Sequence, residues 1–336
     1  MKYLPRNYRQ LLSGPLITLR GFIRGMTSSN MKLIIDTDPG MDDAVAIGMA
    51  LSAKQTDIMA VTTVVGNTDT EQGTSNALAL LQAFDRFDVP VFKGASSPIV
   101  PCKQTDYWHG KDGFGDVMKL NPCTNQLQEK HAVHAINELA SAHPGEITLV
   151  TLGPLTNVAL ALKLNPKLPS QLKEMVIMGG NYRGEGNVTM TAEFNFVVDP
   201  TAAHIVFEEF SCPKYLVTWE LTKNKHFTPI EVVDKYCSYN NKRAQFMKIL
   251  FDAANAMHGF PMTQICDAVA MAVALDRSVI TKVHHLYGKV ELHGEHTAGM
   301  CCYDWMNKLG REKNIYLVDD IDIMKYRRLL LQSVES

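Results

Sequence analysis

The sequence lacks the features that would place the protein in a membrane or on nucleic acid. No uninterrupted apolar run approaches the roughly 20 residues of a membrane-spanning helix. Lysine and arginine number 33 against 35 acidic residues, and no basic block of the kind that follows a phosphate backbone is present. Neither a membrane nor nucleic acid is therefore expected as a partner, and we expect a cytoplasmic protein.

Cysteines with the regular spacing of a metal site are also lacking. The seven cysteines are scattered, except for the adjacent pair Cys301 and Cys302. An odd number without repeated spacing is typical of a reduced intracellular protein and not of a disulfide framework.

Acidic residues are missing from the N-terminus. The chain before Asp36 contains six lysines and arginines, several serines and no carboxylate. This composition suits a mitochondrial transit peptide, but a plain N-terminal extension, with Met26 or Met31 as internal starts, is the interpretation that we favour. We expect residues 1–30 to be a basic extension, disordered or targeting, and residues 31–336 to form the folded domain.

Short apolar, β-branched runs alternate with segments of helical period along the rest of the chain. This alternation predicts an α/β fold with a mostly parallel central sheet flanked by helices, in a single domain. We expect strands at 32–36, 58–66, 89–94, 147–153, 174–180 and 214–220, and helices at 42–53, 71–85, 130–142, 155–163, 200–209, 240–257 and 267–275.

The run DTDPGMDDA, at residues 36 to 44, follows the first predicted strand and holds four carboxylates: Asp36, Asp38, Asp42 and Asp43. Like charges this close repel and raise one another's pKa unless a positive charge lies among them. A hard dication with oxygen ligands satisfies that need. An aspartate before a helix is most often only an N-cap, but capping explains one of the four and not all.

A phosphatase of the haloacid dehalogenase type also begins with an apolar strand that runs into DxD. Such sites usually continue with a Gly-Thr or similar pair. Here Pro39 and Gly40 follow, with two further aspartates beyond them. The local match therefore fails.

Other predicted strands also end in polar or glycine-rich turns, namely GNTD, GPLTN and MGGN. In open α/β sheets the ligand site lies beyond the carboxyl ends of the strands. Four strands would therefore deliver polar groups to one edge of the sheet.

An ordered set of motifs resembles the inosine-uridine nucleoside hydrolase family. DTDPGMDDA after KLII is followed by TTVVGN at 62–67, LGPLTN at 152–157, VIMGGN at 176–181 and AEFNFVVDPTAAHIVF at 192–207. The resemblance runs from about residue 31 to at least residue 276. It implies hydrolysis of the N-glycosidic bond of ribonucleosides to free base and ribose, with a bound Ca²⁺ and an assembly of two or four identical chains.

The resemblance also implies roles for individual residues. The calcium ligands would be Asp38, Asp43, the main-chain carbonyl of Leu152, and Asp267, and Asp38 would also be the general base toward a water on the cation. The positions that match residues binding the sugar hydroxyls are Asp42, Asn67, Asn187, Glu193, Asn195 and Asp267. Met178 matches a position that packs near the ribose. Each role has a structural alternative. Asn187 and Asn195 could be turn residues, Glu193 a surface charge, and Met178 part of the core.

Activation of the leaving base is where the sequence departs from many family members. They carry a histidine directly before the aspartate that matches Asp267, whereas this chain has Cys266, as a subgroup of the family does. A thiol is a weak hydrogen-bond donor, so a packed cysteine is an alternative to an acid. The loop YWHGKDGFGD, at 107–116, resembles a mobile loop over the pocket. Its Tyr107 and Trp108 suit stacking on a base. His109 is a candidate contact to the nucleoside, or else an exposed loop histidine without a ligand role.

Two other functions remain open at this stage. A non-catalytic, calcium-dependent nucleoside- or ribose-binding protein would keep the cation cage without turnover. A hydrolase of a related N-riboside, such as nicotinamide riboside, would share every sugar contact and differ in the leaving group.

Overall fold

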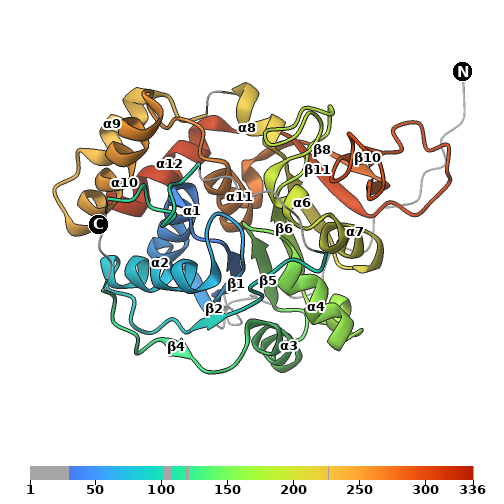
Figure 1. Cartoon of the computed structure of the whole chain (residues 1–336), viewed down its shortest axis with the longest axis horizontal. Coiled ribbons are helices and arrows are strands. Elements are labelled where there is room, and N and C mark those ends of the chain that lie inside the picture. Colours follow the sequence, from blue (N-terminus) through green and yellow to red (C-terminus); the bar gives the residue numbers. More distant parts are fainter. Residues whose placement is uncertain (1–29, 101–107, 118–120, 226, 336) are drawn as a thin grey trace, which may run out of the picture. The chain divides into compact units, whose positions relative to one another are not determined.

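The computed structural model describes residues 30–100, 108–117, 121–225 and 227–335. Within them a sheet of nine strands has the order β4-β3-β2-β1-β5-β6-β7-β11-β8 (Figure 1). Neighbouring strands are parallel from β4 to β11, and β8 is antiparallel to β11. The strands are β1 (Met31–Thr37), β2 (Thr56–Thr63), β3 (Val91–Lys93), β4 (Leu127–Gln128), β5 (Ile147–Thr151), β6 (Glu174–Met178), β7 (Lys214–Val217), β8 (Ile280–Leu286) and β11 (Ile315–Ile321).

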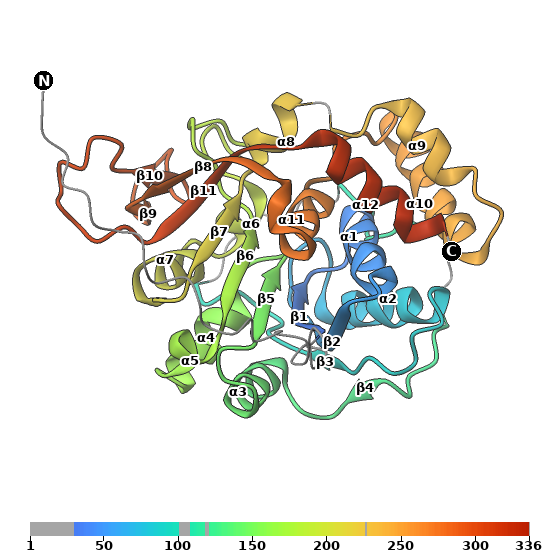
Figure 2. The same ribbon diagram turned by 180° about the vertical axis from the view of Figure 1, so that it is seen from behind.

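Helices cover both faces of the sheet (Figures 1 and 2). Alternation along β1 explains why, because Leu33 and Ile35 enter one apolar core and Ile34 enters the other. The first core holds residues of α1 (Met41–Ser52), α2 (Thr70–Ala83), α9 (Ile230–Cys237), α10 (Lys242–His258), α11 (Cys266–Leu275) and α12 (Ile323–Glu335). The second holds residues of α3 (Ala132–Ala142), α4 (Thr156–Leu164), α5 (Leu168–Gln171) and α7 (Pro200–Glu209).

The predicted α/β fold with a mostly parallel sheet is confirmed. The predicted strand at 214–220 was too long, because β7 ends at Val217 and the next helix, α8 (Trp219–Lys225), already begins at Trp219. Elements after residue 276 were not predicted: β8, β11 and α12, a 3-10 turn (Arg277–Val279), and the hairpin of β9 (Gly288–Val290) and β10 (Cys301–Tyr303). The short α6 (Phe194–Val198) was also missed. The predicted N-terminal extension lies outside the described residues, apart from Asn30, and stays a prediction.

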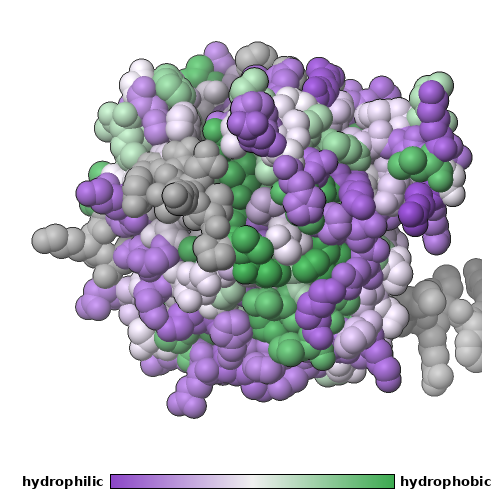
Figure 3. Space-filling view, turned by 45° about the vertical axis from the view of Figure 1, so that its right-hand side comes forward, coloured by the Kyte–Doolittle hydropathy of each residue, from purple (hydrophilic) through white to green (hydrophobic). Residues whose placement is uncertain are grey.

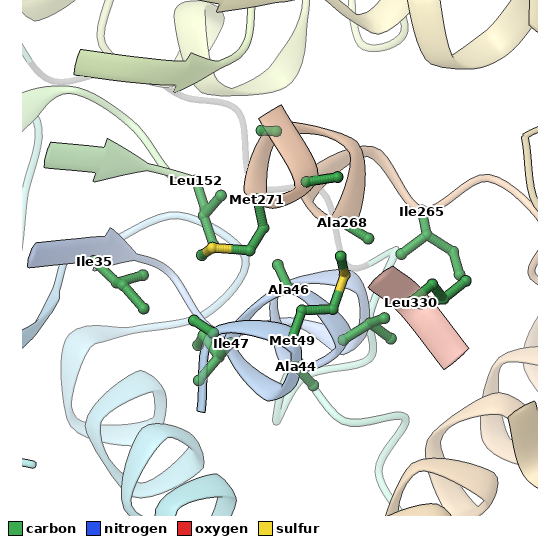
Figure 4. Close-up of a cluster of buried hydrophobic side chains, with 14 of the residues drawn as sticks. Ile35, Ala44, Ala46, Ile47, Met49, Leu152, Ile265, Ala268, Met271 and Leu330 are labelled. Carbon is green, nitrogen blue, oxygen red and sulfur yellow. The ribbon is translucent and has the colours of Figure 1, made fainter. Parts of the chain in front are cut away.

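The packing of α1 against α11 determines where the carboxylates lie. Figure 4 shows Ala46 and Met49 of α1 on the side that faces Ala268 and Met271 of α11. Alanine at such a contact lets two helices approach closely. Since α1 opens with Asp42 and Asp43 and α11 with Asp267, this contact brings acidic side chains from distant parts of the chain to one place.

Enlarging the α1–α11 contact should weaken the fold. Ala268 has no exposed surface, so Ala268→Leu has to displace neighbouring side chains. We expect the free energy of unfolding in urea to fall by about 1–3 kcal/mol. Ala142→Leu is the control, because Ala142 is exposed at the end of α3. Equal stability of the two variants would contradict close packing at this contact.

Candidate active site

The carboxyl ends of β1, β2, β5, β6 and β7 surround a pocket of about 530 Å³. It collects every residue predicted to bind substrate, together with Leu152, His109 and Cys266. The lining residues are Asp42, Asn67, Trp108, His109, Leu152, Met178, Gly186, Asn187, Val188, Glu193, Phe194, Asn195, Trp219, Phe260, Pro261, Met262, Thr263, Gln264, Cys266 and Asp267. Asp38 and Asp43 are buried, each with 1% of its surface exposed.

Three carboxylates form a tight group at the pocket. Oxygen atoms of Asp42, Asp43 and Asp267 all lie within 4.8 Å of one another. Asp43 is fixed by hydrogen bonds from the Thr37 hydroxyl, from the Gly40 N–H at 2.9 Å and from the Asn67 amide at 3.2 Å. Local turn chemistry and a side chain from the next strand thus hold one member of the group in place.

Asp38 has one satisfied and one unsatisfied oxygen. Its Oδ2 accepts a hydrogen bond from the Asn67 N–H at 2.8 Å, whereas Oδ1 is buried and has no hydrogen-bond partner. Two glycines make room for this carboxylate. A Cβ at Gly66 would lie 1.9 Å from Oδ2, and one at Gly153 would lie 2.5 Å from Oδ1. The backbone of two other strand ends is therefore shaped around the Asp38 side chain.

Burial raises the pKa of all these carboxyl groups. For Asp38, Asp43 and Asp267 the charges of neighbouring aspartates raise it further, and burial brings the pKa of Asp42 to about 6. The charged forms become favourable together only when a cation lies among them. A donor set made only of oxygens, with one buried oxygen left unpaired, fits a hard dication of the calcium type.

Asp36 is a buried carboxyl group in β1 that connects the site to β2 and α4. Its Oδ1 accepts hydrogen bonds from Thr62 of β2 and from Asn157 of α4, the latter at 2.8 Å. Asn157 also donates to the Thr63 carbonyl at 2.9 Å. Burial raises the pKa of Asp36 to about 7. Three separate sequence motifs therefore meet at one buried carboxyl group.

The predicted sugar contacts form a polar wall. Glu193 caps α6 and accepts hydrogen bonds from Asn195 N–H at 3.0 Å and Gly180 N–H at 2.8 Å. Only 2% of Glu193 is exposed and burial raises its pKa to about 7, so its interpretation as a surface charge was wrong. The Asn195 amide donates to the Leu152 carbonyl at 2.7 Å. Asn187 accepts from the Phe194 N–H at 2.9 Å.

Cys266 lines the pocket and is 6% exposed. Its Sγ lies 3.0 Å from the Thr222 hydroxyl, a contact in which either group can donate, and that hydroxyl also lies 2.8 Å from the Trp219 carbonyl. Gln264 Nε2 also donates to this hydroxyl, at 3.2 Å. Burial raises the pKa of the thiol. The geometry therefore favours the packed cysteine over the acid.

The loop over the pocket is held at two points, although Tyr107 lies outside the described residues. The Trp108 ring stacks on His258 of α10, with 3.8 Å between ring centres. His109 Nδ1 accepts from the Met41 N–H at 3.2 Å, and its Nε2 lies 3.4 Å from Asp42 Oδ1. Because His109 is only 9% exposed, its interpretation as an exposed loop residue was wrong.

Known proteins share this fold and these motifs. The family model described as inosine-uridine preferring nucleoside hydrolase matches residues 33–328. The inosine-uridine preferring nucleoside hydrolase of Crithidia fasciculata is 35% identical over 310 residues, which cover 90% of this chain and 97% of that one. The chain belongs to the inosine-uridine preferring nucleoside hydrolase family.

Two further relatives agree with this assignment to the nucleoside hydrolase family. A non-specific ribonucleoside hydrolase of Salmonella enteritidis is 34% identical and covers 90% of this chain and 97% of its own. The solved structure of an inosine-guanosine nucleoside hydrolase has a TM-score of 0.84 and 37% identity, and covers 90% of this chain and 98% of that one. Membership of the subgroup with cysteine stays a prediction.

Several pocket residues of this nucleoside hydrolase were missed from the sequence: Trp219, Phe260, Met262, Thr263 and Gln264. Trp219 carried a usable signal, because it follows a strand that ends at the same edge of the sheet. The segment 260–264 carried none, since its place at the pocket depends on how α10 and α11 pack.

The glycine next to Asp38 gives a direct test of this geometry. We expect Gly66→Ala to displace the Asp38 carboxylate and to weaken calcium binding, measured by titration calorimetry. Gly73→Ala is the control, because its Cβ would make only ordinary contact, 3.4 Å from Pro39 Cδ. Within α2 that change should raise stability by roughly 0.5–1 kcal/mol. Unchanged calcium affinity in Gly66→Ala would contradict the role given to this contact.

Proposed function

We propose that the protein hydrolyses the N-glycosidic bond of ribonucleosides to free base and ribose, using a water activated by Ca²⁺. The observation that carries the proposal is the buried group of carboxylates at the floor of a pocket lined with amides and carboxylates. Family membership supports the reaction class, and the oxygen-only donor set supports the cation.

The proposed calcium ligands are Asp38, Asp43, the Leu152 carbonyl and Asp267. Bound calcium would lower the pKa of a water and bind the 2′ and 3′ hydroxyls of ribose. Asp38 would accept the proton of that water, for which its unpaired Oδ1 suits it. Asp42 lies within the same group and faces the pocket, where it accepts hydrogen bonds from the sugar.

The remaining wall orients the sugar. Asn67, Asn187, Glu193 and Asn195 supply amide and carboxyl groups around the pocket, and Met178 packs beside them. Fixed polar groups of this kind hold the anomeric carbon beside the attacking water and stabilise an oxocarbenium-like transition state. Because Cys266 is buried and packed against the Thr222 hydroxyl, we expect help to the departing base to come from another group or from solvent.

Two features of the structure concern membranes and the assembly of the protein. No helix in the described part of the chain is long and apolar enough to cross a bilayer. Figure 3 shows a band of hydrophobic residues between hydrophilic ones on one face of the molecule. Apolar surface of this kind suits contact with another copy of the chain, so an assembly of two or four chains remains our prediction.

Substitution of the proposed base gives the main test. With inosine, uridine and nicotinamide riboside as substrates and calcium present, we expect Asp38→Asn to lower kcat by about 10²–10⁴-fold. Asp57→Asn is the control, because Asp57 is exposed at the start of β2. Release of ribose is the measurement.

Three other outcomes of this panel are informative. Cys266→Ala should keep most of the activity, and a loss as large as that of Asp38→Asn would restore Cys266 as the acid. No ribose release by the wild type would count against the proposal. Calcium-dependent ribose binding without product would then favour a binding protein.

Removal of calcium should destabilise the protein in a pH-dependent way. Burial raises the pKa of Asp36 and Glu193 to about 7 and that of Asp42 to about 6, from ordinary values near 4. The folded protein then binds more protons than the unfolded chain, so without cation its stability falls as pH rises through this range. The pKa of each proposed carboxylate ligand, Asp38, Asp43 and Asp267, is raised as well, and calcium would bind their deprotonated forms. We expect the rise in Tm on adding calcium to chelator-treated protein to be larger at pH 8 than at pH 5, and the reverse order would contradict the carboxylate site.

A further inference from the structure

Glu220 is a buried carboxylate that the proposed mechanism does not use. It is the second residue of α8, directly beyond β7, and has no exposed surface. A buried carboxylate is costly unless hydrogen bonds compensate its lost hydration. The partners of Glu220 therefore indicate what it is for.

Three backbone N–H groups from a single turn point at this carboxylate. The Tyr182 N–H donates to Oε2, the Arg183 N–H donates to Oε1 at 2.8 Å and Oε2 at 3.0 Å, and the Glu185 N–H donates to Oε1 at 2.9 Å. Gly184 lies within this turn at a φ of +80°, a conformation that glycine adopts without strain. Successive N–H groups arranged in this way form a concavity that needs an anion, and Glu220 supplies it.

This turn opens the segment that carries a predicted sugar contact. The loop of residues 181–192 runs from the end of β6 toward α6, and its Gly186, Asn187 and Val188 line the pocket. Asn181 closes the base of the loop through a hydrogen bond from its amide to the Thr191 carbonyl. Only one residue, Gly186, lies between the turn held by Glu220 and Asn187, so the position of the Asn187 backbone follows directly from that turn.

Helix α8 connects this loop to the other side of the pocket. Trp219, the residue before Glu220, lines the pocket, and its backbone N–H donates to the Gly180 carbonyl at 3.1 Å. Thr222, one turn further on, bonds to Cys266. Glu220 thus ties the loop to a helix that is itself fixed to the start of α11.

We propose that Glu220 is a positioning residue for the sugar side of the site: its charge holds the turn at 182–185 and thereby sets the place of Asn187. The proposal rests on the proposed hydrolysis of ribonucleosides. Glu220 acts through the loop and touches no substrate. An amide at this position keeps the size of the side chain but removes the charge and turns an N–H toward N–H donors.

A double-mutant cycle tests whether Glu220 works through Asn187. We expect Glu220→Gln and Asn187→Ala each to lower kcat/KM for inosine or uridine by about 10- to 100-fold. Because the two residues act in sequence, the double variant should lose little more than the more damaging single variant. Losses that multiply would overturn the proposal. Glu185→Gln is the control, because its exposed carboxylate lies in the same turn and pairs with Lys223, and it should retain wild-type kcat/KM.

A second route avoids any loss of folding caused by changing a buried charge. Gly184→Ala strains the turn but leaves Glu220 in place, and it should show the same non-additivity with Asn187→Ala. Additive losses there would again overturn the proposal.

Amide hydrogen exchange separates this proposal from the proposed function. Without substrate, the amides of residues 182, 183 and 185 should exchange faster in Glu220→Gln than in the wild type or Glu185→Gln. Unchanged exchange would overturn the positioning role, whether or not the protein hydrolyses nucleosides. Absence of hydrolysis by the wild type, with faster exchange in Glu220→Gln, would count against the proposed function alone.

Discussion

The structure depends on the burial of several carboxylates within a few ångströms of one another. Such a group is unfavourable in an apolar interior, since each charge loses hydration and repels its neighbours. The fold accommodates it with hydrogen bonds from Thr37, Gly40 and Asn67, and with two glycines that leave room for Asp38. The remaining imbalance is the reason to propose a hard cation at this site, and the unpaired Oδ1 of Asp38 is the oxygen proposed to accept a proton.

Packing of helices converts this local chemistry into a site. The first aspartates follow β1 directly, but Asp267 is far away in the sequence and reaches them only because α11 lies against α1. The alanines between these helices therefore contribute to the position of the carboxylates as well as to stability. The outer part of the pocket has a different origin, because Trp108, His258 and Phe260 come together by contacts between a loop and the end of α10.

The sequence predicted the floor of the site well and its outer wall poorly. Asp38, Asp42 and Asp43 were predictable because a buried strand, a Pro-Gly turn and a helix start occur in one short run. Strand β8 was not, because it is an exposed edge strand without apolar alternation. Strand β11 was missed although its apolar run, residues 315–318, carried a usable signal. Glu220 was hidden for another reason. Its segment predicts a strand, and only the tertiary contact with the turn at 182–185 shows what its carboxylate does.

Helix α8 couples two sides of the pocket to each other. One side of this short helix holds the loop that carries Asn187, a proposed sugar contact, and its next turn holds the residue before Asp267. A change in α8 that opened room for a different base would therefore also shift groups that we propose to bind the ribose. New base preferences should arise more readily in the segment 260–263, which lines the pocket and precedes Gln264, the residue bonded to α8, so that recognition of the base can diverge while the proposed recognition of ribose is kept.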